Sequence, residues 1–448
     1  MPEYYLQANP QQIDRYVDWV ARRITRTIRY VFILWVQFNE GKLCIEYAKE
    51  RRDRLHVKTL CFHTIETCTS QTIQGWADSL TSRAYRGSKI GKSIKVFLNP
   101  FSGKGFAVKG YYEYADPLFT AAHCRVEVQT TKYSGHAQEL VREDPDINSW
   151  DVIACCSGDG LPHEVLNGLA QREDAGQILR NIPVIQLPGG SGNAMCVSLF
   201  ETTSISHAAL YTIKGVPHSI DLMSVTQGDK RRISFLSQNF GYLAECDLQT
   251  EHMRHLGGAR FLVGFLQRIF NPPVYGCDIA IHKDSNGDRN YEMGNEPKDS
   301  MISNESTNQA LPCLRFGTDS DEIPNGWTLE RHANSAIIFA GQLPFVDATS
   351  KVFPSAKLDD GMVDMILVDA GIGSLKFLKI LLEISKGTHV RMREVHYRKV
   401  AAYRVSPMRT DGSLSVDGEM FPFAPFQVEV HQQLGMTLLP PESIKYSS

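Results

Sequence analysis

A strand, a glycine turn and a helix follow one another between Asp151 and Leu169, and this order constrains the fold more than any other stretch. Residues 151–156 form a short apolar run of the length of a buried strand. After the turn, apolar residues recur on one face of a helix that Pro162 can begin. Asp159 stands between two glycines, where backbone N–H groups and a helix N-terminus can face an anion. An ordinary strand-to-helix turn with an aspartate N-cap has the same pattern, so this stretch alone leaves both interpretations open.

Length and charge exclude several classes of protein. A chain of 448 residues predicts two or three domains, and its 47 basic and 50 acidic residues give no electrostatic reason for nucleic-acid binding. The ten cysteines show no C-x-x-C pair and no zinc-ligand spacing, which argues against a zinc site or a disulfide scaffold and favours reducing cytosol. The N-terminus does not resemble a signal peptide, and the apolar run at 30–36 is too short to span a bilayer. We expect a soluble protein that is at most peripheral to membranes.

Residues 1–90 are predicted to form a small, β-rich N-terminal extension of α+β type. A helix is expected over 14–30, a strand over 55–67 and a second helix over 72–84. The segment Gly87–Ser93 resembles a P-loop, but it has three residues between its glycines where four are needed, and the next strand follows it instead of preceding it. We therefore reject a P-loop at this boundary.

Residues 91–216 alternate between strands and helices, which predicts a parallel sheet with helices on its faces. Strands expected at 94–98, 151–156 and 183–187 each end in a polar, glycine-rich loop. In an open parallel sheet, the loops at the carboxyl edge meet at one crevice where ligands bind. Each loop alone could be a structural turn, but the three together predict a nucleotide or phosphate site.

Residues 217–445 are predicted to form a mostly antiparallel, sandwich-like β domain. Its expected strands include single long ones over 232–240 and 396–405, and helices are expected over 242–270 and 373–386. Residues 285–325 are rich in polar residues and glycine, so we predict a disordered insert there. The fold class is thus α/β plus all-β, with the small N-terminal extension in front.

The loop sequences resemble those of the diacylglycerol-kinase-type lipid kinase superfamily. This resemblance rests on Leu98-Asn99-Pro100 with Gly103-Lys104-Gly105, on Ser157-Gly158-Asp159-Gly160 with His163-Glu164 and Asn167-Gly168, and on Pro188-Gly189-Gly190-Ser191-Gly192-Asn193. Further segments narrow the resemblance to the sphingosine kinase branch, with features of fungal long-chain-base kinases. These segments are Phe240–Asp247, the residues from Glu251 to Phe261, Val416–Glu419 and Pro425–Val430. The resemblance covers roughly residues 94–440 without the insert.

The resemblance implies a two-domain enzyme that binds ATP, with Mg²⁺, between the α/β and β domains. Asp159 would be the general base that accepts the proton of a lipid hydroxyl. No cluster of carboxylates marks the Mg²⁺ ligands. The implied ATP-binding residues are Asn99, Gly103, Lys104, Thr131, Ser157, Gly158, Gly160, Glu164, Gly190, Ser191, Gly192, Arg254, Arg260, Asp417, Gly418 and Glu419.

The implied acceptor is a sphingoid base, whose ammonium group needs an acidic partner. Ser237, Asp247 and Glu251 are the predicted substrate-binding residues. A partly buried carboxylate beside apolar residues is costly unless a cation compensates it, so Asp247 is a reasonable partner for the ammonium. Asp247 could instead cap a helix or pair with Arg254, and the residues alone leave this open.

The sequence departs from the family pattern in two places. Phe101-Ser102 replaces smaller or basic residues in the first loop, which puts the phosphate contacts there in doubt. Glu245-Cys246 replaces an aspartate and a small apolar residue, which puts substrate preference in doubt. His163 is interpreted as a supporting or helix-face histidine, not as a catalyst.

Other functions remain as alternatives to a sphingoid base kinase. They are a diacylglycerol or ceramide kinase, whose substrate has no cation, and a catalytically inactive lipid-binding module. NAD kinases share a Gly-Asp-Gly loop but fit the apolar stretch after Arg254 poorly. We expect a cytoplasmic protein in peripheral contact with intracellular membranes and no nucleic-acid partner, and the oligomeric state is left open.

Overall fold

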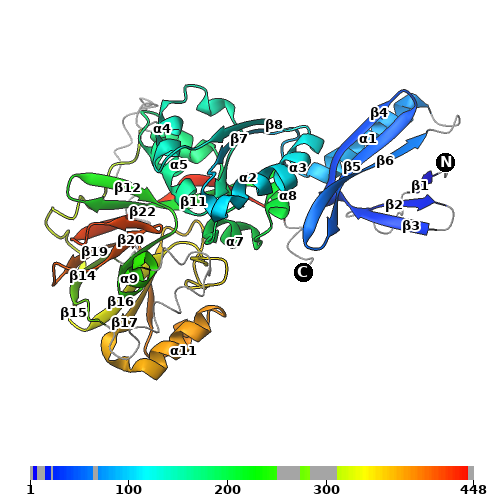
Figure 1. The fold of residues 1–448 in the computed structure, drawn as a ribbon. Coiled ribbons are helices and arrows are strands. Elements are labelled where there is room, and N and C mark those ends of the chain that lie inside the picture. The colour runs from blue at the N-terminus through cyan, green and yellow to red at the C-terminus, as the bar shows by residue number, and fades with distance from the viewer. Residues whose placement is uncertain are drawn as a thin grey trace.

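The computed structural model of the protein describes residues 4–7, 16–21, 24–63, 69–249, 273–282 and 310–441. Two three-stranded antiparallel sheets and one helix form its N-terminal part (Figure 1). The elements are β1 (Tyr4–Gln7), β2 (Tyr16–Ala21), β3 (Ile24–Arg29), β4 (Ile33–Asn39), β5 (Lys42–Arg51), β6 (Arg54–His63) and α1 (Ser70–Tyr85). The sheet orders are β1-β2-β3 and β4-β5-β6, and α1 packs against β4. The predicted strand near 55–67 and the predicted helix at 72–84 are confirmed as β6 and α1.

The helix predicted over 14–30 is wrong, because β2 and β3 occupy this segment and pair antiparallel with each other. β-Branched residues dominate Ile24–Arg29, and such residues favour a pleated strand over a helix. A disulfide that the cysteine spacing did not reveal joins Cys44 to Cys61. These two cysteines are directly opposite each other on β5 and β6, so strand pairing brings them together.

Four parallel strands form the central sheet, in the order β10-β9-β7-β8. The strands are β7 (Ser93–Leu98), β8 (Arg125–Thr130), β9 (Val152–Ser157) and β10 (Val184–Pro188). The helices are α2 (Phe106–Gly110), α3 (Asp116–Ala121), α4 (His136–Glu143), α5 (Gly160–Ala170), α6 (Ala175–Asn181), α7 (Ala194–Phe200) and α8 (Ile205–Lys214). Every residue of β9 is buried, as expected for an apolar strand inside a parallel sheet. Because β10, β9 and β7 are neighbours, the loops that follow them share one edge of the sheet.

Two six-stranded sheets, paired antiparallel throughout, form the C-terminal part. The first, in the order β12-β11-β22-β19-β14-β15, contains β11 (Val216–Gln227), β12 (Lys230–Ser234), β14 (Cys277–His282), β15 (Thr328–His332), β19 (Ala402–Pro407) and β22 (Phe426–Leu439). The second, in the order β18-β17-β16-β13-β20-β21, contains β13 (Ser237–Gly241), β16 (Ser335–Gly341), β17 (Val363–Asp369), β18 (His396–Val400), β20 (Leu414–Val416) and β21 (Glu419–Phe421). Two helices, α9 (Tyr242–Gln249) and α11 (Ser374–Ile384), complete this part. This architecture confirms the predicted fold class.

The strands predicted over 232–240 and 396–405 are each two strands that belong to different sheets. The chain leaves the first sheet at Ser234 and enters the second at Ser237, and it returns from the second to the first around Ala401. Both corners are apolar, so the hydrophobic pattern runs through them without a break. This is why the sequence alone joined the two strands.

The prediction of disorder over 285–325 is wrong for residues 310–325, which are held against the first six-stranded sheet. The backbone N–H groups of Arg315 and Phe316 donate to the Glu429 carboxylate at 2.9 and 3.1 Å. The Arg404 guanidinium donates to the carbonyls of Asp321 and Thr318 at 2.6 and 2.7 Å. The remainder of the predicted insert, and the helix predicted beyond residue 249, lie outside the described residues.

The parts of the molecule pack on one another through a continuous core. One buried cluster includes side chains of the β4-β5-β6 sheet, α1 and the parallel sheet, and reaches Leu434 and Leu438 of β22. The Thr437 hydroxyl donates to the carbonyl of Val184 at 2.9 Å, which joins β22 to β10. A second cluster fills the C-terminal sheets. The parallel sheet and the antiparallel sheets therefore meet in a fixed arrangement, which the candidate site uses.

Candidate functional site

The glycine loops after β7, β9 and β10 contact one another at the carboxyl edge of the parallel sheet. A Cβ atom on Gly190 would lie 2.3 Å from Cα of Gly158, and one on Gly103 would lie 2.3 Å from the carbonyl oxygen of Gly189. The Ser102 hydroxyl accepts a hydrogen bond from the N–H of Gly158 at 3.1 Å. Glycine is required at these contacts because no side chain fits between the backbones. The three predicted loops therefore meet at one edge of the sheet, and they contact one another through their backbones.

Asp159 lies at the centre of this contact, at the N-cap of α5. Its Oδ1 accepts hydrogen bonds from the N–H of Met195 at 3.1 Å and from Nε2 of Gln186 at 3.2 Å. Burial raises the pKa of Asp159 to about 6, and these donors oppose the rise. A Cβ on Gly192 would lie 2.5 Å from Asp159 Oδ2, so the glycine leaves room beside that oxygen. A carboxylate with this pKa can exchange a proton near neutral pH.

Glu164 joins the site to the loop after β8. Its Oε2 accepts a hydrogen bond from the N–H of Ala137 at 3.1 Å, at the start of α4. Burial raises the pKa of Glu164, and Glu419 raises it further. The buried Thr131 donates its N–H to the carbonyl of Leu98 at 2.9 Å, which fixes the loop after β8 beside the end of β7. The predicted site residues that follow β7, β8, β9 and β10 thus lie at the same edge of the sheet.

Asp417 lies in a buried network and is only 2 % exposed. Its Oδ1 accepts from the Ser234 hydroxyl at 2.6 Å and from the N–H groups of Leu236 and Ser237 at 3.0 and 2.9 Å. Its Oδ2 accepts from the N–H of Phe235 at 3.2 Å and lies 2.8 Å from Nδ1 of His163. The carboxylate therefore fixes the corner between β12 and β13 and connects that corner to α5.

Glu419 approaches the start of α5 because of a tight turn at Asp417 and Gly418. Both turn residues have positive φ, 52° and 85°, and they connect the paired strands β20 and β21. A Cβ on Gly160 would lie 3.0 Å from Oε1 of Glu419. Of the predicted C-terminal site residues, Glu419 is therefore exposed beside the start of α5, whereas Asp417 is buried.

Several predicted site residues lie outside what the structure describes. These are Arg254, Arg260 and Glu251, together with the side chains of Lys104 and Asp247. The backbone of Asp247 belongs to α9, which follows β13 directly. Ser237 is buried next to Asp417, and Asn99 accepts a hydrogen bond from the N–H of Phe101 at 2.9 Å. Ser191 is exposed on the loop after β10.

Three supporting residues were not among the predicted site residues, although Asn167 and Asn193 belong to the motifs that carry the resemblance. Gln186, fully buried in β10, donates to Asp159 and accepts the N–H of Cys196 at 2.9 Å. Asn193 donates to the carbonyl of Gly190 at 2.8 Å and so closes the third loop. Asn167 contacts both the N–H and the carbonyl of Ile233, at 2.9 and 2.8 Å. A polar residue in an otherwise apolar strand was the available signal for Gln186, because buried amides need partners.

The rejected P-loop resemblance has a structural explanation. Lys92 is buried, and its ammonium donates to the carbonyls of Thr212, Ile213 and Gly215 at the end of α8, at 3.0, 2.7 and 2.9 Å. Burial lowers the pKa of Lys92 to about 8. This lysine caps a helix and is not available to a phosphate.

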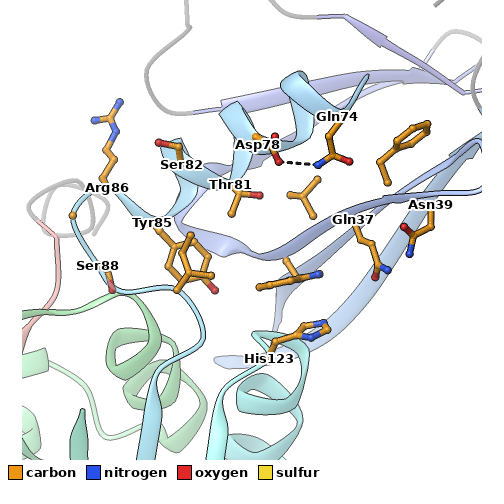
Figure 2. A pocket seen from close by; sticks show the side chains of 15 residues that line it. Gln37, Asn39, Gln74, Asp78, Thr81, Ser82, Tyr85, Arg86, Ser88 and His123 are labelled. Atoms are coloured by element: carbon orange, nitrogen blue, oxygen red, sulfur yellow. Dashed lines mark hydrogen bonds between the residues drawn. The ribbon is translucent and has the colours of Figure 1, made fainter. Parts of the chain in front are cut away.

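A cavity of about 670 Å³ lies elsewhere, between α1, β4 and His123 (Figure 2). Gln37 and Asn39 line it on the strand side, and Gln74 and Asp78 line it on the helix side (Figure 2). It contains none of the predicted site residues. In the described part of the chain, no group of three or more His, Cys, Asp or Glu side chains is placed to hold a metal ion.

Three protein families match parts of the chain. The diacylglycerol kinase catalytic domain matches residues 93–225, and the YegS C-terminal NAD kinase beta sandwich-like domain matches residues 324–437. A domain of unknown function, DUF7493, matches residues 17–86. The first family covers the glycine loops and Asp159, and the second covers Asp417 and Glu419.

Two yeast proteins are similar over most of the chain. Sphingoid long chain base kinase 5 of Saccharomyces cerevisiae is 37% identical over 422 residues, which cover 81% of this chain and 61% of that protein. Sphingoid long chain base kinase 4 of Schizosaccharomyces pombe is 32% identical over 428 residues, which cover 94% and 89%. The chain thus spans about three fifths of the first relative and most of the second.

A solved structure of a candidate diacylglycerol kinase from Bacillus anthracis strain Sterne has a similar fold. Its TM-score is 0.55 and its identity is 17%, and the match covers 79% of this chain and 97% of that one. At this identity the likeness shows the fold alone.

Proposed function

The chain belongs to the family of sphingoid long-chain base kinases, and on this premise we propose that it transfers the γ-phosphoryl group of ATP to the primary hydroxyl of a sphingoid base. The observation that carries this proposal is Asp159, a partly buried carboxyl group with a pKa near 6, at the meeting point of three glycine loops. Sphingosine, dihydrosphingosine and phytosphingosine all carry the required hydroxyl and ammonium groups.

Asp159 is the general base in this proposal. Its carboxylate accepts the proton of the lipid hydroxyl as the hydroxyl oxygen bonds to the γ-phosphorus and the bond from that phosphorus to ADP breaks. The N–H of Met195 and the Gln186 amide fix the carboxylate from behind. A pKa near 6 leaves the group ionised at neutral pH while keeping it more basic than a solvent-exposed aspartate.

The polyphosphate of ATP would lie against the glycine loops. Backbone N–H groups in such turns bind anions, and a loop without side chains lets a phosphate approach closely. Magnesium, when bound with ATP, neutralises phosphate charge. Of the carboxylates of Asp159, Glu164, Asp417 and Glu419, that of Glu419 could face the ion, since the other three all accept hydrogen bonds from backbone N–H groups.

The sphingoid base would enter from the side of α9. Asp247 and Glu251 remain the proposed partners of the ammonium group, and the buried Ser237 of β13 remains the third proposed substrate-binding residue. The sphingoid base is an amphiphile, so we also propose peripheral contact with intracellular membranes. In the described residues, no helix is both long enough and apolar enough to cross a membrane.

The test is phosphorylation of dihydrosphingosine, diacylglycerol and ceramide by the purified chain with radiolabelled ATP. We expect label on the base alone, and we expect Asp159→Asn to lower the rate by about 10² to 10⁴-fold, as for loss of a general base. Asp229→Asn, a change of the same type at an exposed turn, should leave the rate unchanged. Circular dichroism of both variants would show that they fold.

Each other outcome points to a different function. Label on diacylglycerol or ceramide would remove the reason for an acidic partner at Asp247 and leave a neutral-lipid kinase. ATP binding without label on any lipid would indicate a lipid-binding module that lost catalysis. Equal rates for Asp159→Asn and Asp229→Asn would refute the assignment of the base.

A further inference from the structure

Helix α11 packs on the C-terminal sheets and exposes to solvent a face that carries both leucines and lysines. It lies at the end of the molecule opposite the N-terminal module (Figure 1). Phe377 and Ile380 are buried in the core of these sheets, and the partly buried Leu381 packs beside them. The helix is therefore fixed in orientation, and its outward face is a fixed surface.

Two leucines on this outward face are exposed to solvent. Leu375 is 83 % exposed and Leu382 is 58 % exposed. They are seven residues apart, which is two helical turns, so they lie on one line along the helix. Lys379 is exposed and lies between them on that line. An isolated exposed leucine needs no explanation, but two aligned leucines of this exposure form an apolar strip.

Basic residues surround the leucines. Between residues 374 and 394 the chain has five basic and two acidic residues, whereas its overall net charge is −3. Lys376 pairs with Glu394 at 2.7 Å and Lys386 lies 3.7 Å from Glu383, yet the two lysine side chains are 59 % and 68 % exposed. The other basic residues are Lys379, Arg391 and Arg393, and all three are exposed.

We propose that this leucine–lysine face, formed by Leu375, Lys376, Lys379, Leu382 and Lys386, docks the protein on the surface of an anionic lipid bilayer. The leucines enter the boundary between headgroups and acyl chains, and the ammonium groups contact lipid phosphates. Lysine is depleted at the centres of protein–protein interfaces, so this mixture of groups fits a lipid surface better than a protein. The inference rests on the proposed function in one respect, because a sphingoid base resides in membranes.

The position of α11 agrees with such a role. It follows β17, and α9, which carries Asp247, contacts β13 and β16 of the same six-stranded sheet. Docking through α11 therefore places the sheet with the proposed substrate residues at the bilayer. Two weak signals are needed together, because neither a short apolar strip nor a few lysines hold a protein at a membrane alone.

The experiment is sedimentation of the full chain with vesicles of phosphatidylcholine, alone or mixed with phosphatidylserine. We expect binding to the anionic vesicles and at least about tenfold weaker binding to the neutral ones. Lys379→Gln with Lys386→Gln should weaken anionic binding by about fivefold for each lysine and remove the preference for phosphatidylserine. Leu375→Ser with Leu382→Ser should weaken binding to both kinds of vesicle by at least about tenfold.

Matched control variants separate this face from general surface properties. Leu329→Ser, at a leucine that is 62 % exposed on β15, and Lys230→Gln, at an exposed lysine, should bind vesicles like the unchanged protein. Equal binding by the α11 variants and these controls would overturn the proposal.

Kinase activity is measured separately, on a sphingoid base dissolved in detergent micelles. The α11 variants should keep their activity there, and a loss in micelles would mean that the substitutions damage the enzyme itself and would overturn the docking role. A chain that binds anionic vesicles through α11 but phosphorylates no lipid would refute the proposed function and leave the docking surface in place.

Discussion

The carboxylate of Asp417 should contribute more to stability than any exposed acidic residue of the chain. It accepts hydrogen bonds from one hydroxyl and three backbone N–H groups of residues 234–237, and it lies 2.8 Å from Nδ1 of His163. All of these groups are buried, so none of the donors can turn to water. Removing the acceptor therefore leaves donors unpaired.

Asp417→Asn isolates the contribution of the charge. Asparagine tolerates the positive φ of this position, so the backbone turn should remain. The amide oxygen can keep the contacts of Oδ1, but the amide NH₂ then faces the N–H of Phe235. A hydrogen bond to a charged group contributes about 1.5–3 kcal/mol, and an unpaired buried donor costs about 1–3 kcal/mol. We expect the free energy of unfolding to fall by about 3 kcal/mol.

Urea unfolding of a double-mutant cycle with Ser234→Ala tests this reasoning. Ser234→Ala removes one of the three donors to Oδ1 and should cost about 1.5 kcal/mol. Because the two residues are in contact, the double variant should lose at least about 0.5 kcal/mol less than the sum of the single losses. Asp229→Asn is the control and should stay within about 0.5 kcal/mol of the unchanged protein. If Asp417→Asn also stays within that limit, the network does not stabilise the corner as described.

Four further predictions concern the site, its supports and helix α1. Because Asp159 acts as a carboxylate and burial raises its pKa to about 6, kcat/KM should be constant above that pH and fall about tenfold per pH unit below it; a flat profile down to pH 5 would contradict the raised pKa. Gly190→Ala should raise the KM for ATP at least about tenfold, since its Cβ would lie 2.3 Å from Cα of Gly158. Gly75→Ala, at a position in α1 with open space around it, should raise the free energy of unfolding by about 0.5–1 kcal/mol, which thermal unfolding would measure. Asn167→Ala removes two hydrogen bonds to Ile233 and should lower the unfolding free energy by about 1–3 kcal/mol in urea, and an unchanged midpoint would show that solvent replaces them.

The sequence by itself determined the local parts of the site. The apolar runs before the glycines predicted β7, β9 and β10, and the glycines themselves predicted backbone-lined turns, because strand length and turn chemistry are set by neighbouring residues. Asp159 was identified for the same reason, since it stands inside one of these turns. The family resemblance depended on these local motifs and is confirmed by the comparisons.

Only the tertiary structure decided how these parts meet. The order β10-β9-β7-β8, the corner at Ser234–Ser237 and the approach of Asp417 to His163 join residues far apart in the chain. Within the segment predicted as a helix, residues 16–21 and 24–29 are strands that pair with each other, a contact that adds to the strand preference of the β-branched residues in β3. Residues 310–325 became ordered because Glu429 and Arg404 supply partners that the segment lacks itself. Hydrogen bonds between distant segments carry no local pattern, so packing alone determines whether they form.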